Sequence, residues 1–175
     1  MRSTPTVLIL LPLVAAPLFG AEAEAAPSDA MRAVAWLAGE WEGEGWIMTG
    51  PGQRTEFRGT ESVESRLGGG VLIIEGRHTA ADDPNVVVHH ALAVVSWDSG
   101  SGEYRFEPHV AGRPKPQTAA RVEDGVFIWT MEVPGGRVRY RIRQSESGEW
   151  RETGERSAGP GKWFPFFEMT MRRVR

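Results

Sequence analysis

The chain has 175 residues, a formal net charge of −3 and no cysteine. The near-neutral balance argues against nucleic acid as a partner, because nucleic-acid-binding domains usually carry a basic stripe. The lack of cysteine excludes disulfides and thiolate chemistry, so an exported domain of this composition depends on its apolar core for stability.

The N-terminus has the order of segments that is typical of an export signal. Arg2 precedes an apolar run of about 15 residues, 6–20, which is shorter than the ~20 residues that a membrane anchor needs. Small residues and acids follow this run. We therefore expect a signal peptide over 1–25 with cleavage near Ala23–Ala26, and one mature domain over 26–175 that is periplasmic or secreted and not stably inserted in a membrane.

One short helix and about ten strands are expected after the signal. The segment 28–38, SDAMRAVAWLA, has apolar residues at helical spacing behind a capping Ser28 or Asp29. Because so many antiparallel strands would expose long edges unless the sheet closes, the pattern predicts an all-β, antiparallel up-and-down β-barrel. The expected strands are 41–48, 54–65, 71–79, 86–97, 103–110, 117–122, 126–133, 137–143, 149–156 and 164–174.

The best-defined hairpin is VPGGRVRYRI. A two-residue turn at Gly135-Gly136 places Val133 opposite Val138. Six side chains then share an inner face: Trp129, Met131, Val133, Val138, Tyr140 and Ile142. The outer face carries a row of four arginines, which is either a solvated strand face or an anion-binding stripe: Arg137, Arg139, Arg141 and Arg143.

Three earlier hairpins predict polar side chains inside the barrel. Pairing Trp97 with Glu103 would place His90 on the inner face, with Tyr104 and Phe106 on that same face of the next strand. Carried back along the chain, this register places Glu75 opposite His90, and Glu61 opposite Glu75. Such a row would form either a ligand site or an internal salt-bridge network, because an unpaired buried charge is costly.

The candidate ligand-binding residues follow from these registers. The apolar walls are expected from Tyr104, Phe106, Trp129 and Tyr140, and the polar anchor from Glu61, Glu75, Arg77, His90 and Glu152.

Three stretches resemble a known group of barrels. LAGEWEGEGW at 37–46 resembles the first strand of lipocalin-like (calycin) proteins, most closely the nitrobindin-like barrels and bacterial lipocalin-like domains of unknown function. LGGGVLIIEG at 67–76 and the C-terminal stretch 150–174 are similar to the same domains. By this resemblance, Trp41 closes the barrel base, and Arg172 or Arg173 packs on Trp41.

The resemblance to nitrobindins implies a haem held by a histidine late in the chain. This chain has four histidines: His78, His89, His90 and His109. Because none of them lies late in the chain, we expect no tight haem binding. His90 could replace the missing haem ligand only from a different wall of the barrel. No metal site is expected either, because His89 and His90 point to opposite faces of one strand. His78 and His89 would share an outward face, which is the less favoured alternative for a metal site.

The sequence therefore favours an exported barrel that holds a small, partly apolar ligand. One alternative is an enzyme in which an inward glutamate and His90 act as acid and base. Another is a structural or accessory domain whose barrel is filled by its own side chains.

The first testable prediction concerns the N-terminus. The exported protein should begin between Ala23 and Pro27, because small residues follow directly on the apolar run. N-terminal sequencing of the protein from the extracytoplasmic fraction checks this, and Met1 retained in a membrane fraction would contradict it.

Overall fold

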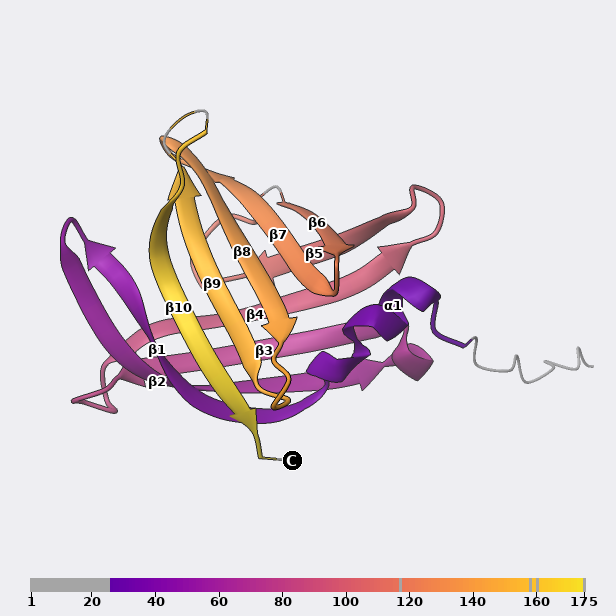
Figure 1. Ribbon diagram of the computed structural model, residues 1–175, viewed down its shortest axis with the longest axis horizontal. Helices are drawn as coiled ribbons and strands as arrows, with labels where there is room; N and C mark the ends of the chain where they lie inside the picture. The colour runs from indigo at the N-terminus through magenta and orange to yellow at the C-terminus, as the bar shows by residue number, and fades with distance from the viewer. Residues whose placement is uncertain (1–25, 117, 158, 160, 175) are drawn as a thin grey trace, which may run out of the picture.

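The computed structural model describes residues 26–116, 118–157, 159 and 161–174. The expected signal peptide lies outside these residues. The described chain forms a closed antiparallel barrel in which each strand pairs with its neighbour in sequence and β1 closes on β10 (Figure 1). The strands are β1 Gly39–Gly50, β2 Gln53–Arg66, β3 Val71–Ala80, β4 Val87–Asp98, β5 Glu103–His109, β6 Thr118–Glu123, β7 Val126–Val133, β8 Gly136–Gln144, β9 Trp150–Ser157 and β10 Phe164–Arg173. The expected barrel of about ten strands is confirmed.

A short helix covers one end of the barrel. Helix α1 spans Asp29–Val34 and continues into a 3-10 turn, Ala35–Leu37, so the expected N-terminal helix is confirmed. Ser28 caps it by accepting a hydrogen bond from the backbone N–H of Met31. Its apolar side is fully buried against the barrel, and the Tyr104 hydroxyl donates to the carbonyl of Ala30 at 2.6 Å. No helix in the described part of the chain is long and apolar enough to span a membrane.

Three tryptophans close the barrel beneath this helix. Trp36, Trp41 and Trp150 pack edge to face, with ring centroids 5.7–6.2 Å apart. The guanidinium of Arg173 lies 4.1 Å from the centre of the Trp41 ring and donates to the carbonyls of Trp36 and Ala38. The expected packing of a C-terminal arginine on Trp41 is confirmed, and it joins the last strand to the N-terminal turn.

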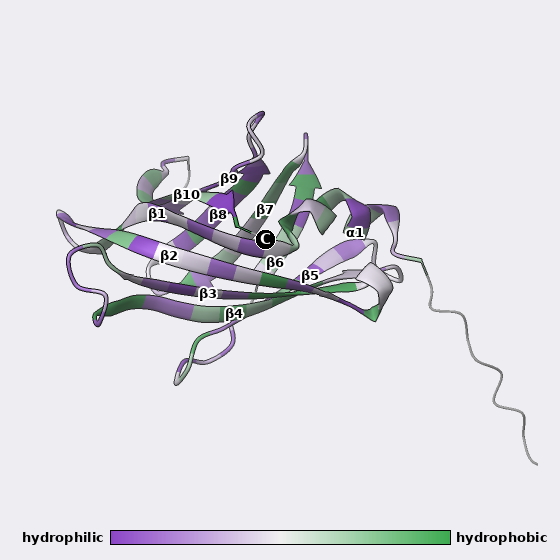
Figure 2. Cartoon of the chain, turned by 90° about the horizontal axis from the view of Figure 1, so that it is seen from below, coloured by the Kyte–Doolittle hydropathy of each residue, from purple (hydrophilic) through white to green (hydrophobic). Residues whose placement is uncertain are grey.

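Residues of different hydropathy alternate along many strands (Figure 2). In the β7–β8 hairpin the predicted inner face is correct, because Trp129, Val138 and Ile142 are buried. The register differs by two residues, since Trp129 faces Tyr140 and Val133 faces Gly136. A shift by two preserves the face of every side chain, so the four arginines still point outward.

Two other registers differ by one residue, and here the faces change. Trp97 pairs with Tyr104 rather than Glu103, which turns His90 to the outer face. The sequence pattern could not decide this, because β4 carries apolar residues at consecutive positions, as in Val94-Val95. Correspondingly, Glu75 and Arg77 of β3 lie outside, and both are exposed.

The second one-residue difference lies between β2 and β3, and it leaves the inner face of β2 as predicted. The turn 67–70 is closed by the pair Arg66 and Val71, so Glu61 faces Gly76 instead of Glu75. Phe57, Glu61 and Val63 are therefore buried inside, as predicted.

The second prediction tests the barrel closure. Arg173→Ala should lower the free energy of unfolding by roughly 1–2 kcal/mol, because the variant loses a cation–π contact and two charge-assisted hydrogen bonds. Arg172→Ala is the matched control, since Arg172 is exposed and pairs only with Glu149 at 3.2 Å. Urea unfolding measures both, and an equal loss in the two variants would contradict the assigned role of Arg173.

Candidate functional site

The lumen of the barrel contains a small cluster of buried polar side chains. Glu61 of β2, His78 of β3 and Glu152 of β9 are each less than a tenth exposed. Buried ionisable groups are uncommon and need partners, so this cluster is the first place to look for a functional role.

Glu61 and His78 fit together because each lies over a glycine of the neighbouring strand. In the β2–β3 ladder Gly59 faces His78, and Glu61 faces Gly76. A Cβ at Gly76 would lie 2.4 Å from a carboxylate oxygen of Glu61, and a Cβ at Gly59 would lie 2.4 Å from the imidazole of His78. Glycine is therefore required at both positions for these two side chains to lie flat on the inner wall.

The two side chains join through one hydrogen bond and are both neutral. His78 Nε2 lies 2.9 Å from Glu61 Oε1. Burial raises the pKa of Glu61 to about 8 and lowers the pKa of His78 to about 4. At pH 7 a protonated carboxyl thus faces a neutral imidazole. The contact is a neutral hydrogen bond, in contrast to the salt-bridge network considered from the sequence.

Glu152 is the third member of this cluster. Burial raises its pKa to about 8, and the charge of the nearby Glu61 adds to this effect. Its carboxyl accepts a hydrogen bond from Trp150 Nε1 at 3.2 Å. Glu152 was predicted opposite Tyr140 but faces Ile142, a shift by two that keeps it inside.

A row of stacked aromatic rings lines the adjoining wall. Trp129 stacks on Phe106 at 4.5 Å and on Tyr140 at 4.2 Å between ring centroids. Burial raises the pKa of Tyr140 well above its usual range, and the charge of Glu152 contributes. Trp129 Nε1 is buried and has no hydrogen-bond partner among the described residues, and the same is true of His78 Nδ1. A buried polar atom without a partner is uncommon, because it has lost water and gained nothing.

A second inward histidine lies on β4, at the end of the lumen opposite α1. His89 faces His78 directly in the β3–β4 ladder, with ring centroids 5.4 Å apart, so both point inward. His78 is buried, yet His89 is exposed. The turns β1–β2 and β3–β4 lie at this end, away from the helix (Figure 1). The inward position of His78 and His89 corrects the outward face expected for them.

An opening lies in the barrel wall, between β5 and β6. Among the described residues these strands share one ladder pair, Tyr104 and Ala120, whereas their other neighbours pair over six or more residues. A pocket of about 680 Å³ occupies this seam. Its lining includes residues whose side chains point inward, such as Phe106 and Ala120, and residues whose side chains point outward, such as Arg105, so the pocket lies in the wall itself.

The candidate residues from the sequence divide into two groups. Tyr104, Phe106, Trp129, Tyr140, Glu61 and Glu152 line the inside of the barrel, as expected. Glu75, Arg77 and His90 lie on the outer face, which is a correction that follows from the one-residue register differences. Glu75 and His90 form an exposed surface pair at 3.0 Å.

Sequence reasoning missed His78 as a lumen residue. The signal that could have found it is the pair of glycines in the middle of two adjacent strands, Gly59 and Gly76, because interior glycines mark a close approach of another group. The described residues contain no cluster of three side chains suited to a metal ion.

The lumen does not fit a haem held from the late strands. The inward residues of β9 and β10 include Glu152, Phe167 and Met169, and no histidine follows His109. His90, the possible substitute, lies outside, and His78 is hydrogen-bonded to Glu61.

The third prediction compares an inner with an outer glutamate. Glu61→Ala should lower the free energy of unfolding by ~1–3 kcal/mol, because it leaves the buried Nε2 of His78 without a partner. Glu75→Ala, the control on the neighbouring strand, should change it by less than ~0.5 kcal/mol, because its ion pair with His90 is exposed. Chemical denaturation decides between them, and a greater loss at Glu75 would show that the register is wrong.

The fourth prediction is a fall in stability above about pH 6.5. Glu61 and Glu152 have folded pKa values of about 8 against 4.5, so the folded state keeps protons that the unfolded chain releases. His78 and His89, whose pKa values desolvation lowers from 6.5 to about 4, together oppose this trend only below pH 6.5. Between about pH 6.5 and 8 the unfolding free energy should fall by on the order of 1–2 kcal/mol per pH unit.

Urea titrations across this pH range measure the slope of the unfolding free energy against pH. In Glu61→Gln/Glu152→Gln the slope should flatten, because neither amide titrates. An unchanged slope in the double variant would assign the pH dependence to other groups.

The comparisons with known proteins identify the fold. No protein-family model matches the chain, and no curated protein matches its sequence. The solved structures with a similar fold include Rv2717c from M. tuberculosis, with a TM-score of 0.62 and 13% identity. They also include the S-type phycobiliprotein lyase CPES from Guillardia theta, with a TM-score of 0.60 and 11% identity. Each alignment covers 85% of this chain and 99% of the other. At these identities the likeness shows the fold alone, a ten-stranded barrel of the lipocalin-like kind.

Proposed function

We propose that this chain is an exported binding protein that holds a small, partly apolar ligand inside its barrel, reached through the β5–β6 seam. The observation that carries the proposal is the pocket of about 680 Å³ at this seam, whose lining includes the inward-pointing residues Tyr104, Phe106 and Ala120. This volume lies within the range of roughly 300–1,000 Å³ that is usual for small-molecule sites.

The wall behind the pocket favours a flat, partly apolar ligand. Phe106 lines the pocket and stacks on Trp129, which stacks in turn on Tyr140. Aromatic faces of this kind bind planar groups through stacking and apolar contact. The unpartnered Trp129 Nε1 is a donor only, so a hydrogen-bond acceptor on the ligand would complement it.

The rim of the pocket does not favour a charged ligand. Its basic side chains have acidic partners: Arg105 pairs with Asp98, Lys115 with Glu107 and Arg121 with Glu123. Because these charges compensate one another, selection by the site comes from shape and apolar contact. The phycobiliprotein lyase with the same fold does not define the ligand of this chain, since the two share only 11% identity.

The geometry gives less support to an enzyme or to a filled barrel. Glu61 and His78 form the inner acid–base pair, but their side chains are 9% and 3% exposed and offer little surface to a substrate. The tryptophans at the helix end fill that part of the core, whereas a pocket lies at the β5–β6 seam. We also propose, on the missing late histidine, that tight haem binding is absent.

The fifth prediction uses N-phenyl-1-naphthylamine, a neutral fluorescent dye. The protein should bind it, and Ala120→Trp should weaken binding at least about tenfold, because the new ring occupies the inner part of the pocket. The matched control is Thr130→Trp, on the outer face of the neighbouring strand β7 and outside the pocket lining.

Fluorescence titration gives both affinities, and thermal unfolding verifies that each variant is folded. A loss in Thr130→Trp alone would place the dye on the outer surface and overturn the lumen proposal. Native mass spectrometry of the protein from its own host then identifies the natural ligand by mass.

A further inference from the structure

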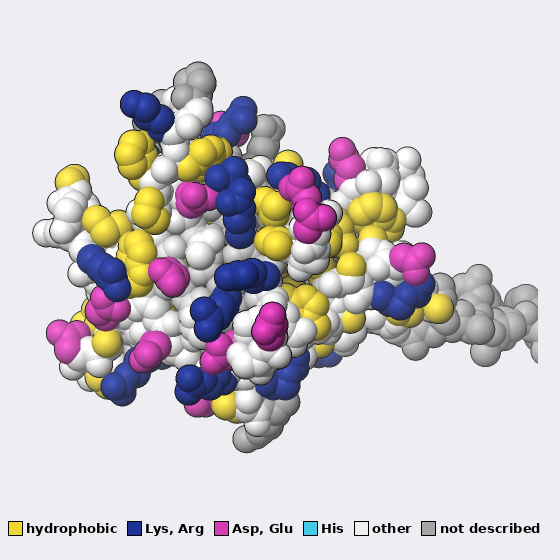
Figure 3. All heavy atoms as spheres, in the orientation of Figure 1, with side chains coloured by type: hydrophobic (Ala, Val, Ile, Leu, Met, Phe, Trp, Pro, Cys, Tyr) yellow, Lys and Arg dark blue, Asp and Glu magenta, His cyan; other side chains and the backbone are white. Residues whose placement is uncertain are grey.

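A second polar site lies on the outside of the barrel, on strands β8, β9 and β10. The ladder places Arg143 directly opposite Arg151, and Arg141 opposite Thr153. On the next strand Thr170 faces Arg151, and Glu168 faces Thr153. Lys and Arg side chains gather in the middle of the face that these strands present (Figure 3).

These residues surround a pocket of about 270 Å³. It is lined by Val126, Arg141, Arg143, Arg151, Glu152, Thr153, Glu168, Met169 and Thr170. Glu152 and Met169 are lumen residues of β9 and β10, so the pocket lies over the strands that carry them, and the outward side chains form its walls. The volume suits a small polar group rather than a drug-sized apolar ligand.

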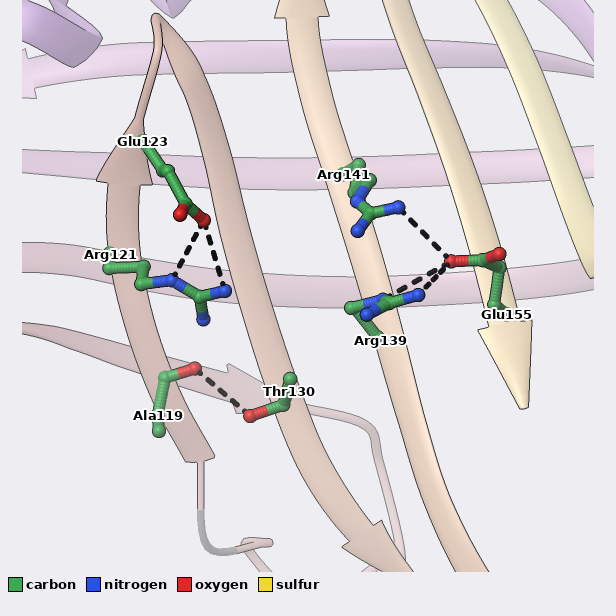
Figure 4. A network of polar contacts seen from close by, with 7 residues as sticks. All are labelled: Ala119, Arg121, Glu123, Thr130, Arg139, Arg141 and Glu155. Atoms are coloured by element: carbon green, nitrogen blue, oxygen red, sulfur yellow. Dashed lines mark hydrogen bonds and ion pairs between the residues drawn. The ribbon is translucent and has the colours of Figure 1, made fainter. Parts of the chain in front are cut away.

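The positive charge in this pocket is only partly compensated. Among the described residues Arg143 has no acidic partner, whereas Arg151 pairs with Glu149 at 3.0 Å. Arg141 reaches Glu155 at 3.4 Å, but Arg139 holds the same carboxylate at 2.7 Å (Figure 4).

The two carboxyls that line the pocket offset this charge only in part. Glu168 is exposed and accepts a hydrogen bond from Trp46 Nε1 at 3.3 Å. Glu152 is buried on the lumen side, and its raised pKa leaves it neutral at pH 7. Arg143 is therefore the arginine of this pocket without an acidic partner among the described residues, whereas Arg141 and Arg151 share theirs with Arg139 and Arg172.

Several other arginines on the outer surface pair with a neighbouring acid. Arg137 pairs with Glu132 at 2.6 Å, Arg54 with Glu56 at 2.7 Å and Arg121 with Glu123 at 3.2 Å. Like charges directly opposite each other in a ladder destabilise a sheet, so the Arg143–Arg151 pair costs stability unless an anion lies between them.

We propose that this pocket, the β8–β10 arginine pocket, binds a phosphate group. Arg143 and Arg151 would bind it from adjacent strands, Arg141 would add a third positive charge, and the hydroxyls of Thr153 and Thr170 are further donors at its rim. Guanidinium groups bind phosphate oxygens in pairs with well-defined geometry, which lysine does not do. The site is on the opposite side of the wall from the proposed ligand lumen and does not depend on that proposal.

Thermal unfolding with added inorganic phosphate tests the inference, against sodium chloride at the same ionic strength. Phosphate should raise the melting temperature of the full chain more than the chloride does, and Arg143→Gln and Arg151→Gln should each weaken phosphate binding, measured by calorimetry, at least about tenfold. Without phosphate, Arg143→Gln should be at least as stable as the unaltered protein, because the repulsion is removed. The matched control is Arg137→Gln, on the same strand and face but paired with Glu132.

An equal loss of binding in Arg137→Gln and Arg143→Gln, or a response to phosphate no greater than to chloride, would overturn the proposal by showing general screening. Flotation with phosphatidic acid vesicles, compared with phosphatidylcholine vesicles, distinguishes the source of the group. Vesicle binding that requires Arg143 would assign a lipid headgroup, whereas binding of inorganic phosphate alone would assign a free phosphate compound.

Discussion

The constraint on which the site depends is the register of β2 against β3. It sets two polar side chains, Glu61 and His78, against two glycines across the same ladder. A shift by one residue that turned β3 over would carry His78 to the solvent and bring Glu75 and Arg77 inside beside Glu61. Because Gly59 and Gly76 leave room on the inner wall, the carboxyl and the imidazole lie flat there and complete one hydrogen bond.

The neutral state of this pair explains how the barrel tolerates it. An ion pair in the lumen would need further partners for every charged atom, whereas a protonated carboxyl and a neutral imidazole need fewer. The cluster is still incompletely satisfied, since His78 Nδ1 and Trp129 Nε1 lack partners among the described residues. Both atoms lie on the inner wall, which also carries the stacked rings and adjoins the seam. The site is thus a wall that combines aromatic surface with unused hydrogen-bonding capacity.

The fold could be predicted from the sequence because the turns and the closure are local features. The glycine turns delimit the strands, and the G-x-W element with a C-terminal arginine predicts the closed base. The faces of β8 were also predictable, since arginines and apolar residues alternate strictly there, and the tight turn then fixes the face of its partner β7. Errors arose in β3 and β4, where Ile73-Ile74 and Val94-Val95 offer an apolar side chain to both faces. In such strands the true register depends on turn geometry and on packing by distant strands, which hydropathy alone does not encode. The seam and the β8–β10 arginine pocket depend on pairings between strands and were likewise beyond a reading of single strands.

The most direct test of this account is the titration of the Glu61 carboxyl carbon by nuclear magnetic resonance, with Glu61→Gln to assign the signal. The account predicts a midpoint near pH 8, because burial beside a neutral His78 holds the proton on the carboxyl. A midpoint close to 4.5, the value of a solvated glutamate, would contradict it by showing that Glu61 is charged in the folded protein or lies outside the lumen.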